Sequence, residues 1–307
     1  MRPRCSHACF LMLSFAQFLD LLVGGVAIGC VYSLVALGFA MIMRATNIIH
    51  FAQGEVMMLG AMCALTSLWL IPALPLVGVV GVAMLSSGIV AMTMELAVYR
   101  TLRRRRVGLM NVITATVGMS ILCMNAARLI WGSEPLRFPE LFASQAYSFA
   151  GLRISAQLFW VMVMGIAIML ALQLFLNHTR TGILMQAMAQ DAEAAQLMGA
   201  NETRMTAYTF GLAGLMAGAA GVMLGSMFFA FFEMGFITGL KGFVAAILGG
   251  IGSITGAMLG GILFGLLETF SAVFLSSAYK DGIGMLLLIA ILLFLPDGLV
   301  GLWQRRS

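Results

Sequence analysis

The sequence predicts an all-α fold, a polytopic transmembrane helix bundle with about eight to nine membrane segments. Hydrophobic residues make up 62% of the 307 residues and charged residues 9%, whereas soluble domains average about 45–50% and about 25%. The mean hydropathy is +1.03. Long apolar runs alternate with short stretches that contain charge or glycine. This pattern is typical of membrane helices, because a transmembrane barrel shows short strands of alternating polarity.

Composition and motifs exclude several classes of function. The net charge of +5 comes from 17 basic and 12 acidic residues, and the basic residues gather in short loops rather than in a nucleic-acid-binding patch. The five cysteines form no Cys-x-x-Cys pair and the three histidines are scattered, so we expect no metal and no cofactor. The motifs HExxH, GxSxG and GxxxxGK(S/T) are missing, which argues against an enzyme.

The first apolar run extends from residue 8 to residue 43. At about 1.5 Å per residue, this run is longer than one crossing of a hydrocarbon core of about 30 Å. We expect either an interfacial piece ahead of the first span or a span that begins near Phe18. A basic start before an apolar run also resembles a secretory signal, but no small-x-small cleavage site follows, so we expect the segment to be retained.

The stretch from Arg44 to Glu55 follows and is the most polar short stretch of the first hundred residues. Arginine is concentrated at Arg100 and at positions 103–106, which marks a cytoplasmic loop under the positive-inside rule. Residues 132–153 carry mixed charge and two prolines, and we expect an outside loop with some local structure. The apolar runs between these polar stretches predict membrane spans at residues 56–70, 76–99, 109–131, 158–176 and 205–231.

The C-terminal part of the chain predicts a broken membrane helix. If the arginine loop lies inside, residues 231–241 lie outside and the C-terminal arginine pair lies inside. That requires an odd number of crossings after residue 241, yet only residues 254–275 and 283–302 are long apolar stretches. We therefore predict a discontinuous, glycine-broken helix at residues 242–252. Irregular backbone at membrane depth is tolerated only where protein or a water-filled cavity surrounds it.

Residues 177–204 form a polar island between two membrane-length apolar runs and are several times longer than a plain connector. Apolar residues recur in it at steps of three and four, which predicts a short amphipathic helix that Gly199 and Asn201 would end. Two spans after the arginine loop, the chain is back in the cytoplasm here. Two interpretations fit the pattern: a surface helix offered to another protein, or an interfacial helix that only caps the bundle.

Glycine ladders and charges inside apolar runs are the remaining signals. Glycines recur near every third or fourth residue at 211–225 and 249–265, which favours close helix packing or leaves room for a solute. A charge at the membrane centre costs about 2.5–3.5 kcal/mol, so it usually faces a cavity or a partner. Glu55 and Glu268 are the better candidates for a functional interior. The charges in or at the ends of apolar runs are Asp20, Glu55, Glu95, Arg128 and Glu268.

Three stretches together resemble the permease subunits of branched-chain amino acid ABC importers, the LivH type. The first runs from Gly24 through the Phe51-Ala-Gln-Gly-Glu55 motif to residue 61, and the second is Gly199 with residues 206–221. The third is residues 239–261, with Leu-Gly-Gly-Ile-Gly-Ser at its centre. The resemblance covers about residues 18–303. This chain departs from the family pattern at His50, where asparagine is typical, which puts a solute role at that position in doubt.

The resemblance implies the partners of an importer: a second permease subunit, two cytoplasmic ABC ATPases and a periplasmic solute-binding protein, at the bacterial inner membrane. ATPase-contacting loops of such importers often read Glu-Ala-Ala-x-x-x-Gly, which matches residues 193–199 within the polar island. The residues expected to couple the chain to an ATPase are Asp191, Glu193, Ala194, Ala195 and Gly199. The residues expected along the solute pathway are Asn47, His50, Gln53, Gly54, Glu55, Gly249, Gly250, Gly252, Ser253 and Glu268.

The family reading makes residues 1–307 one permease domain with a cytoplasmic coupling segment at residues 177–204. Branched-chain amino acids are the default solutes of such permeases, and related permeases for urea, amides or aromatic acids are the nearest alternative. A different class of function is a secondary transporter coupled to protons or sodium through Glu55 or Glu268. A third is a membrane scaffold without a pathway. The length and polarity of the island favour the importer over both.

Overall fold

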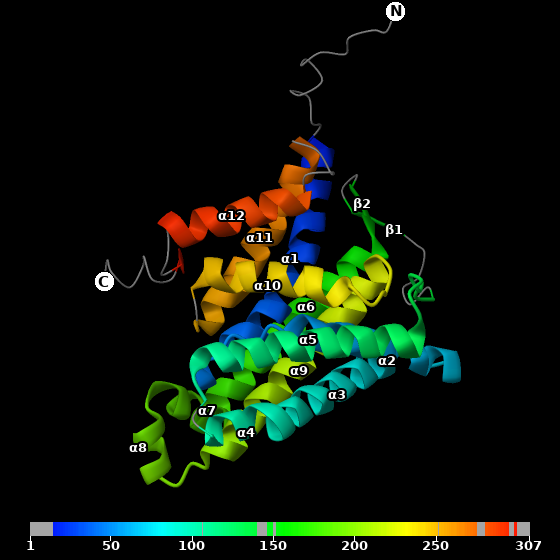
Figure 1. Cartoon of the computed structure of the whole chain (residues 1–307). Helices are drawn as coiled ribbons and strands as arrows, with labels where there is room; N and C mark the ends of the chain where they lie inside the picture. The colour runs from blue at the N-terminus through cyan, green and yellow to red at the C-terminus, as the bar shows by residue number, and fades with distance from the viewer. Residues whose placement is uncertain are drawn as a thin grey trace, which may run out of the picture.

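The computed structural model describes residues 15–105, 107–139, 146–149, 152–250, 252–274, 280–294 and 298–299. Figure 1 shows a bundle of helices with a short β-hairpin at one end. The helices α7 (Arg180–Gln190) and α8 (Ala192–Leu197) project from the opposite end. The two ends of the bundle therefore carry different structures, and the candidate coupling residues lie at one end only.

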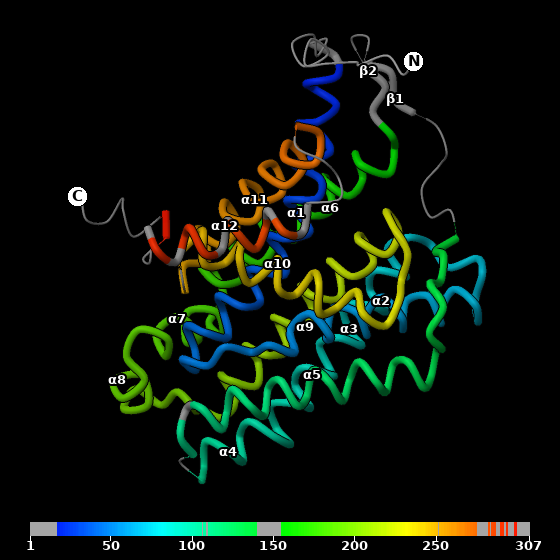
Figure 2. Tube along the Cα trace, turned by 45° about the horizontal axis from the view of Figure 1, so that its top comes forward, coloured from blue at the N-terminus to red at the C-terminus, as the bar shows by residue number. Residues whose placement is uncertain are grey.

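Helix α1 (Phe15–Thr46) is the central element of the bundle. It lies beside α11 (Ile254–Phe274) in both views (Figures 1 and 2). Helix α1 is described from Phe15 onward, so the start of the first span near Phe18 stays a prediction. Residues 1–14, which include the possible interfacial piece, lie outside the described part of the chain.

Helix α2 (Gln53–Leu70) begins three residues before the predicted span at residues 56–70. The polar residues Gln53 and Glu55 are therefore inside the first turn of a helix, and both are fully buried. Sequence alone placed the helix start after them because polar residues usually mark the end of an apolar span. Here they find partners inside the bundle instead.

Helix α3 (Leu76–Met94) continues through a π-helical turn, η2 (Glu95–Tyr99), into α4 (Arg100–Arg104). The predicted arginine loop therefore starts later than expected, because its first residues are helical. The guanidinium of Arg103 forms an ion pair with the buried carboxylate of Glu95 about two turns earlier, which stabilises this extension.

Two predicted spans agree with the structure within two residues at each end. Helix α5 (Leu109–Trp131) has the predicted bounds, and α6 (Ala156–His178) replaces the span at residues 158–176. Between them, β1 (Ala146–Phe149) pairs antiparallel with β2 (Leu152–Ser155). The local structure expected in this loop is confirmed.

The single amphipathic helix predicted within residues 177–204 is instead two helices, α7 and α8, separated by Asp191. Gly199 has a φ of +92° and ends the pair, as predicted. The chain then enters α9 (Glu202–Met227), where the Asn201 side chain accepts a hydrogen bond from the Arg204 N–H. The island is thus a helical hairpin arm rather than one flat helix.

The boundaries predicted for the glycine-broken helix are wrong. Helix α10 (Met234–Gly249) is continuous across most of the segment assigned to the outside and most of the segment assigned to the break. Lys241 lies inside this helix and is buried, because Glu268 neutralises it. Among the described residues of this segment, the irregular backbone lies at Gly250, Gly252 and Ser253, before α11 begins. The last described helix is α12 (Lys280–Phe294).

Six helical segments of the described chain are long and apolar enough to cross a membrane. They are α1, α3 with its extension through α4, α5, α6, α9 and α11. Three further helices are shorter: α2 has 18 residues, α10 has 16 and α12 has 15. The fold is therefore an all-α polytopic membrane bundle with a small β-hairpin.

The glycine ladder at residues 211–225 packs α9 directly against neighbouring backbones. A Cβ added to Gly218 would lie 2.3 Å from the Ala83 carbonyl oxygen of α3, and one added to Gly221 would lie 2.3 Å from the Met57 carbonyl oxygen of α2. Only glycine permits this approach, and in lipid such contacts hold helices together because apolar burial does not distinguish neighbours. The packing role predicted for this ladder is confirmed.

Two glycines of α9, Gly218 and Gly211, should therefore respond differently to substitution by alanine. Gly218→Ala should lower the apparent Tm of the protein in detergent, because overpacking costs about 1–3 kcal/mol. Gly211→Ala is the matched control, since no atom lies within 4 Å of its added Cβ and alanine is the better helix former. Thermal unfolding of both variants checks the prediction, and equal shifts would contradict it.

Candidate functional site

The connection between α1 and α2 carries the first group of candidate pathway residues. Asn47 is exposed and ends α1 with a φ of +54°. The Gln53 N–H donates to the His50 carbonyl oxygen at 3.0 Å, which turns the chain into α2. The structure therefore buries four of these five residues and leaves Asn47 at the surface: the buried ones are His50, Gln53, Gly54 and Glu55.

His50 is packed as an aromatic ring. It is 1% exposed and lies 5.2 Å from the Tyr99 ring and 5.3 Å from the Phe210 ring, measured between centroids. Neither imidazole nitrogen has a hydrogen-bond partner among the described residues. In this conformation His50 therefore fills the space between η2 and α9 and offers no group to a solute.

Gln53 and Glu55 face different neighbours in the bundle core. The Gln53 amide donates to the Ala213 carbonyl oxygen of α9 at 3.0 Å, and the Ser120 hydroxyl of α5 donates to Glu55 Oε1 at 3.2 Å. Glu55 Oε2 has no hydrogen-bond partner among the described residues and lies close to the backbone of Gly235. A buried acceptor without a donor costs about 1–3 kcal/mol. A hydrogen-bond donor on a water or a solute that reached this oxygen would remove that cost.

The contact between α2 and α10 is closed. A Cβ on Gly54 would lie 2.0 Å from the Gly235 carbonyl oxygen and 2.7 Å from the Cα of Gly239. The two backbones therefore touch directly, with no room between them for a solute. Any route past Glu55 requires these two helices to separate.

The second group of candidate residues forms the connection from α10 to α11. Gly250 and Gly252 have φ values of +111° and +80°, a conformation that side chains with a Cβ rarely adopt. A Cβ on Gly249 would lie 2.0 Å from the Gly256 carbonyl oxygen. Ser253 then caps α11, because its hydroxyl accepts from the Gly256 N–H at 3.1 Å.

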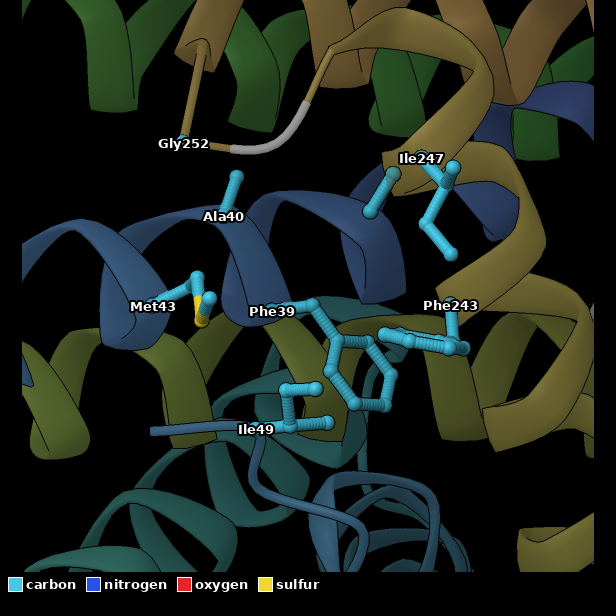
Figure 3. Close-up of a pocket in the computed structure, with 8 residues that line it drawn as sticks. Phe39, Ala40, Met43, Ile49, Phe243, Ile247 and Gly252 are labelled. Atoms are coloured by element: carbon cyan, nitrogen blue, oxygen red, sulfur yellow. The ribbon is translucent and has the colours of Figure 1, made fainter. Parts of the chain in front are cut away.

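The two groups meet at an apolar pocket, which Figure 3 shows in close-up. Ile49 contributes from the first stretch and Gly252 from the second, while the rings of Phe39 and Phe243 lie 5.6 Å apart between centroids. The cavity has a volume of about 40 Å³. No polar side chain lines it: the lining residues are Phe39, Ala40, Met43, Ile49, Phe243, Ala246, Ile247 and Gly252.

Glu268 lies apart from these residues, in an ion pair that sequence reasoning missed. Its Oε1 is 2.6 Å from the Nζ of Lys241, and the Nζ lies 6.0 Å from the centre of the Tyr32 ring. Both charged side chains are buried. The available signal was a lone lysine in a glycine-rich apolar stretch, which sequence reasoning assigned to a loop.

The five candidate coupling residues lie in and beside one short helix: three are in α8, Asp191 is its N-cap and Gly199 follows its C-cap. The Asp191 N–H donates to the Ala187 carbonyl oxygen at 3.0 Å and closes α7, while its Oδ1 accepts from the Ala194 N–H at 3.0 Å and opens α8. Glu193 and Ala194 are exposed, and Ala195 is buried against the arm. The arrangement presents a short helix with a free outer face.

Helix α7 is bonded to the end of α6, whereas α8 has one side-chain hydrogen bond to the bundle among the described residues, from the Gln196 amide to the Glu202 carboxylate of α9 at 3.3 Å. The Gln186 amide donates to the Leu176 carbonyl oxygen at 2.9 Å and to Asn177 Oδ1 at 3.0 Å, both at the end of α6. At the end of α8, Leu197 is 92% exposed and Met198 is 75% exposed. Two large apolar side chains so exposed on a polar arm mark a surface that another protein can cover.

Within the part of the chain that the structure describes, no cluster of three or more His, Cys, Asp or Glu residues could hold a metal ion. The arrangement instead offers buried amide and carboxylate groups at a closed helix contact, an apolar pocket beside them and a projecting helical arm.

Comparison with known proteins gives consistent matches over nearly the whole chain. The family model described as "Branched-chain amino acid transport system / permease component" matches residues 21–292. The chain is 35% identical over 305 residues to the high-affinity branched-chain amino acid transport system permease protein LivH of Salmonella typhimurium, and 36% identical over 305 residues to LivH of Escherichia coli K12. Each match covers 94% of this chain and 96% of the relative. BraD of Pseudomonas aeruginosa is 35% identical over 297 residues, covering 93% and 96%.

The Lys241–Glu268 pair makes a prediction about stability. Lys241→Met should destabilise the protein by about 3–5 kcal/mol, because it leaves a buried carboxylate without its cation. The double variant Lys241→Met with Glu268→Gln removes both charges and should recover most of that loss. Thermal unfolding in detergent checks this order, and a double variant no more stable than the single one would contradict it.

Proposed function

The chain belongs to the family of branched-chain amino acid transport system permease components, and from that membership we propose that it forms the membrane pathway of an ATP-driven importer together with a second permease subunit. It is a multi-pass protein of the plasma (inner) membrane. Residues 1–307 form one permease domain. Together with the six long helices, α2, α10 and α12 would give nine membrane segments, within the predicted eight to nine.

A branched-chain amino acid is the solute that the apolar pocket favours. Its walls include Phe39, Met43 and Phe243, and no side chain in the lining can hydrogen-bond a urea or an amide. The relatives described above are also named for branched-chain amino acids. At about 40 Å³ the pocket is far smaller than a typical small-molecule site of about 300–1,000 Å³, so the transport cycle must widen it by moving α10 from α1.

The observation that carries the mechanism is the arm itself: α7 is bonded to the end of α6, while α8 is exposed beyond it. In this mechanism the arm lies in the cytoplasm and docks with one of two ABC ATPases, and a periplasmic binding protein delivers the solute. Closure of the ATPases on ATP pulls the arm. Helices α6 and α9 transmit the movement as rods, so that the cavity between the permeases opens alternately to each side.

Reconstitution tests this function directly. Proteoliposomes with both permeases, the ATPases and the binding protein should take up leucine only when ATP is present on the cytoplasmic side. The isolated chain should move nothing. Flux by the isolated chain that collapses with an uncoupler would contradict the importer and favour ion coupling through Glu55.

The arm makes a sharper prediction about docking. Glu193→Arg and Gly199→Trp should abolish transport and recovery of the ATPases with the permease, because one reverses the outer charge of α8 and the other strains its end at a φ of +92°. Membrane insertion should be unchanged. Glu134→Arg, an equal charge reversal at an exposed site after α5, is the control and should leave docking intact. Normal transport by both arm variants would show that the arm does not couple.

The pocket makes a prediction about solute flux. Ala40→Leu adds three carbon atoms to the lining and should lower leucine import per ATP hydrolysed by at least about tenfold, since one methylene in an apolar pocket changes discrimination by about 10–200-fold. Ala126→Leu on α5, outside the pocket, is the control. Import and ATP hydrolysis are measured in the same proteoliposomes, and equal coupling in both variants would exclude the pocket from the pathway.

A further inference from the structure

A second cavity, of about 180 Å³, lies at the end of the bundle that carries the arm. Four elements meet around it: the end of α1, the end of α6, helix α7 and the start of α11. It is polar, unlike the pocket of Figure 3, and the two are lined by neighbouring residues, Met43 on the pocket and Arg44 on the cavity. The lining residues are Arg44, Gln173, Leu176, Asn177, Gln186, Ser253, Ile254 and Thr255.

Arg44 is the only charged side chain in this lining. Among the described residues its guanidinium forms no ion pair and no hydrogen bond. It is half-buried, where a charge interacts more strongly than in bulk water. A guanidinium carries five N–H donors in a planar fork that matches a carboxylate or a phosphate, so the cavity favours an anion.

The neutral lining residues add hydrogen-bonding groups suited to the same ligand. Gln173 and Asn177 contribute side-chain amides from α6, and Ser253 and Thr255 contribute hydroxyls from the start of α11. The Gln186 amide already occupies Asn177 Oδ1, which leaves the Asn177 amide nitrogen as a donor. No acidic side chain in the lining opposes a bound anion.

Because of where the cavity lies, a ligand bound in it would affect the movement of the arm. Gln186 belongs to α7 and is bonded to the end of α6, so a ligand in the cavity touches the arm and the three bundle helices at once. Such a ligand bridges parts that must move relative to one another when the arm is pulled. Its binding therefore stabilises one arrangement of the arm, and a ligand that prefers one state shifts the equilibrium toward it.

We propose that this cavity is a cytoplasmic carboxylate site in which the imported amino acid binds by its carboxylate to Arg44, holds α7 in place and slows further import. The proposal rests on the proposed function for the side of the membrane and the identity of the solute. The same chemistry would suit the phosphate of an anionic lipid, which the experiment separates.

The test uses the complete importer in proteoliposomes whose lumen corresponds to the cytoplasm and contains ATP. The lumen also holds leucine, 4-methylpentanoate, which has the carboxylate without the amine, or 3-methylbutylamine, which has the amine without the carboxylate. Leucine and 4-methylpentanoate should slow binding-protein-stimulated ATP hydrolysis and import several-fold relative to an empty lumen, whereas the amine should not. Inhibition by the amine as strong as by the carboxylate would overturn the proposal.

Matched variants locate the effect. Arg44→Gln removes the cation, and Gln173→Glu supplies an internal carboxylate of the same shape, so either should raise the half-inhibitory luminal concentration at least about tenfold. Arg105→Gln, an exposed arginine outside the cavity, should leave it unchanged. Equal inhibition in all three variants would overturn the assignment to this cavity.

Two further outcomes keep the inference and the proposed function apart. If ATP drives import but luminal carboxylate has no effect, the inference falls and the importer stands, whereas no ATP-driven import at all removes the function itself. Vesicles of phosphatidylcholine are compared with vesicles containing phosphatidylglycerol. A rate that depends on the anionic lipid through Arg44 with an empty lumen would assign the cavity to a lipid phosphate and overturn the solute proposal.

Discussion

Direct contact between helix backbones at glycine is the constraint on which this bundle depends. In lipid an apolar helix face gains nothing by choosing another helix over an acyl chain, so association requires close approach of backbones and hydrogen bonds between helices. Gly261 lies against the backbone of Ser33, and the Ser33 hydroxyl donates to the Met258 carbonyl oxygen at 2.7 Å. The same kind of contact joins α9 to α2 and α3, and α10 to α2. Because these contacts leave no space, the polar side chains among them must find partners in the protein or remain unsatisfied.

The buried polar groups form two sets, those with a partner in the described protein and those without one. Lys241 and Glu268 neutralise each other between α10 and α11, where a charge has no water to stabilise it. Around the start of α2, by contrast, several polar atoms lack donors or acceptors among the described residues, including both nitrogens of His50 and Glu55 Oε2. Each such group costs about 1–3 kcal/mol, a cost that water or solute relieves when the helices part. The ion pair favours keeping α10 on α11, whereas the start of α2 favours opening, so the proposed gate would open between α2 and α10.

The sequence predicts the elements here better than their ends. Both ends of α5 and the start of α11 agree with the prediction, although each helix contains a charged residue, Arg128 in α5 and Glu268 in α11. The starts of α2 and α10 are displaced because Gln53 and Lys241 look like residues that leave a membrane, and only the folded chain supplies their partners. The roles that the glycine stretches and the match around Glu193 suggest in the pathway and in coupling stay predictions. The pocket and the cavity beside Arg44 could not be foreseen, since each joins segments some two hundred residues apart in the sequence.

Asp191 is a single residue between two helices, as Thr179 is between α6 and α7, and its neighbours on both sides are helical. Its N–H belongs to the hydrogen-bonding pattern of α7 and its carboxylate to that of α8, and its own φ and ψ of −148° and 101° are extended. Helices α7 and α8 are therefore joined by a single residue with extended backbone. In the proposed mechanism this residue would transmit a displacement along the chain while α8 changes its angle to α7, so that α8 would stay docked on a partner that tilts.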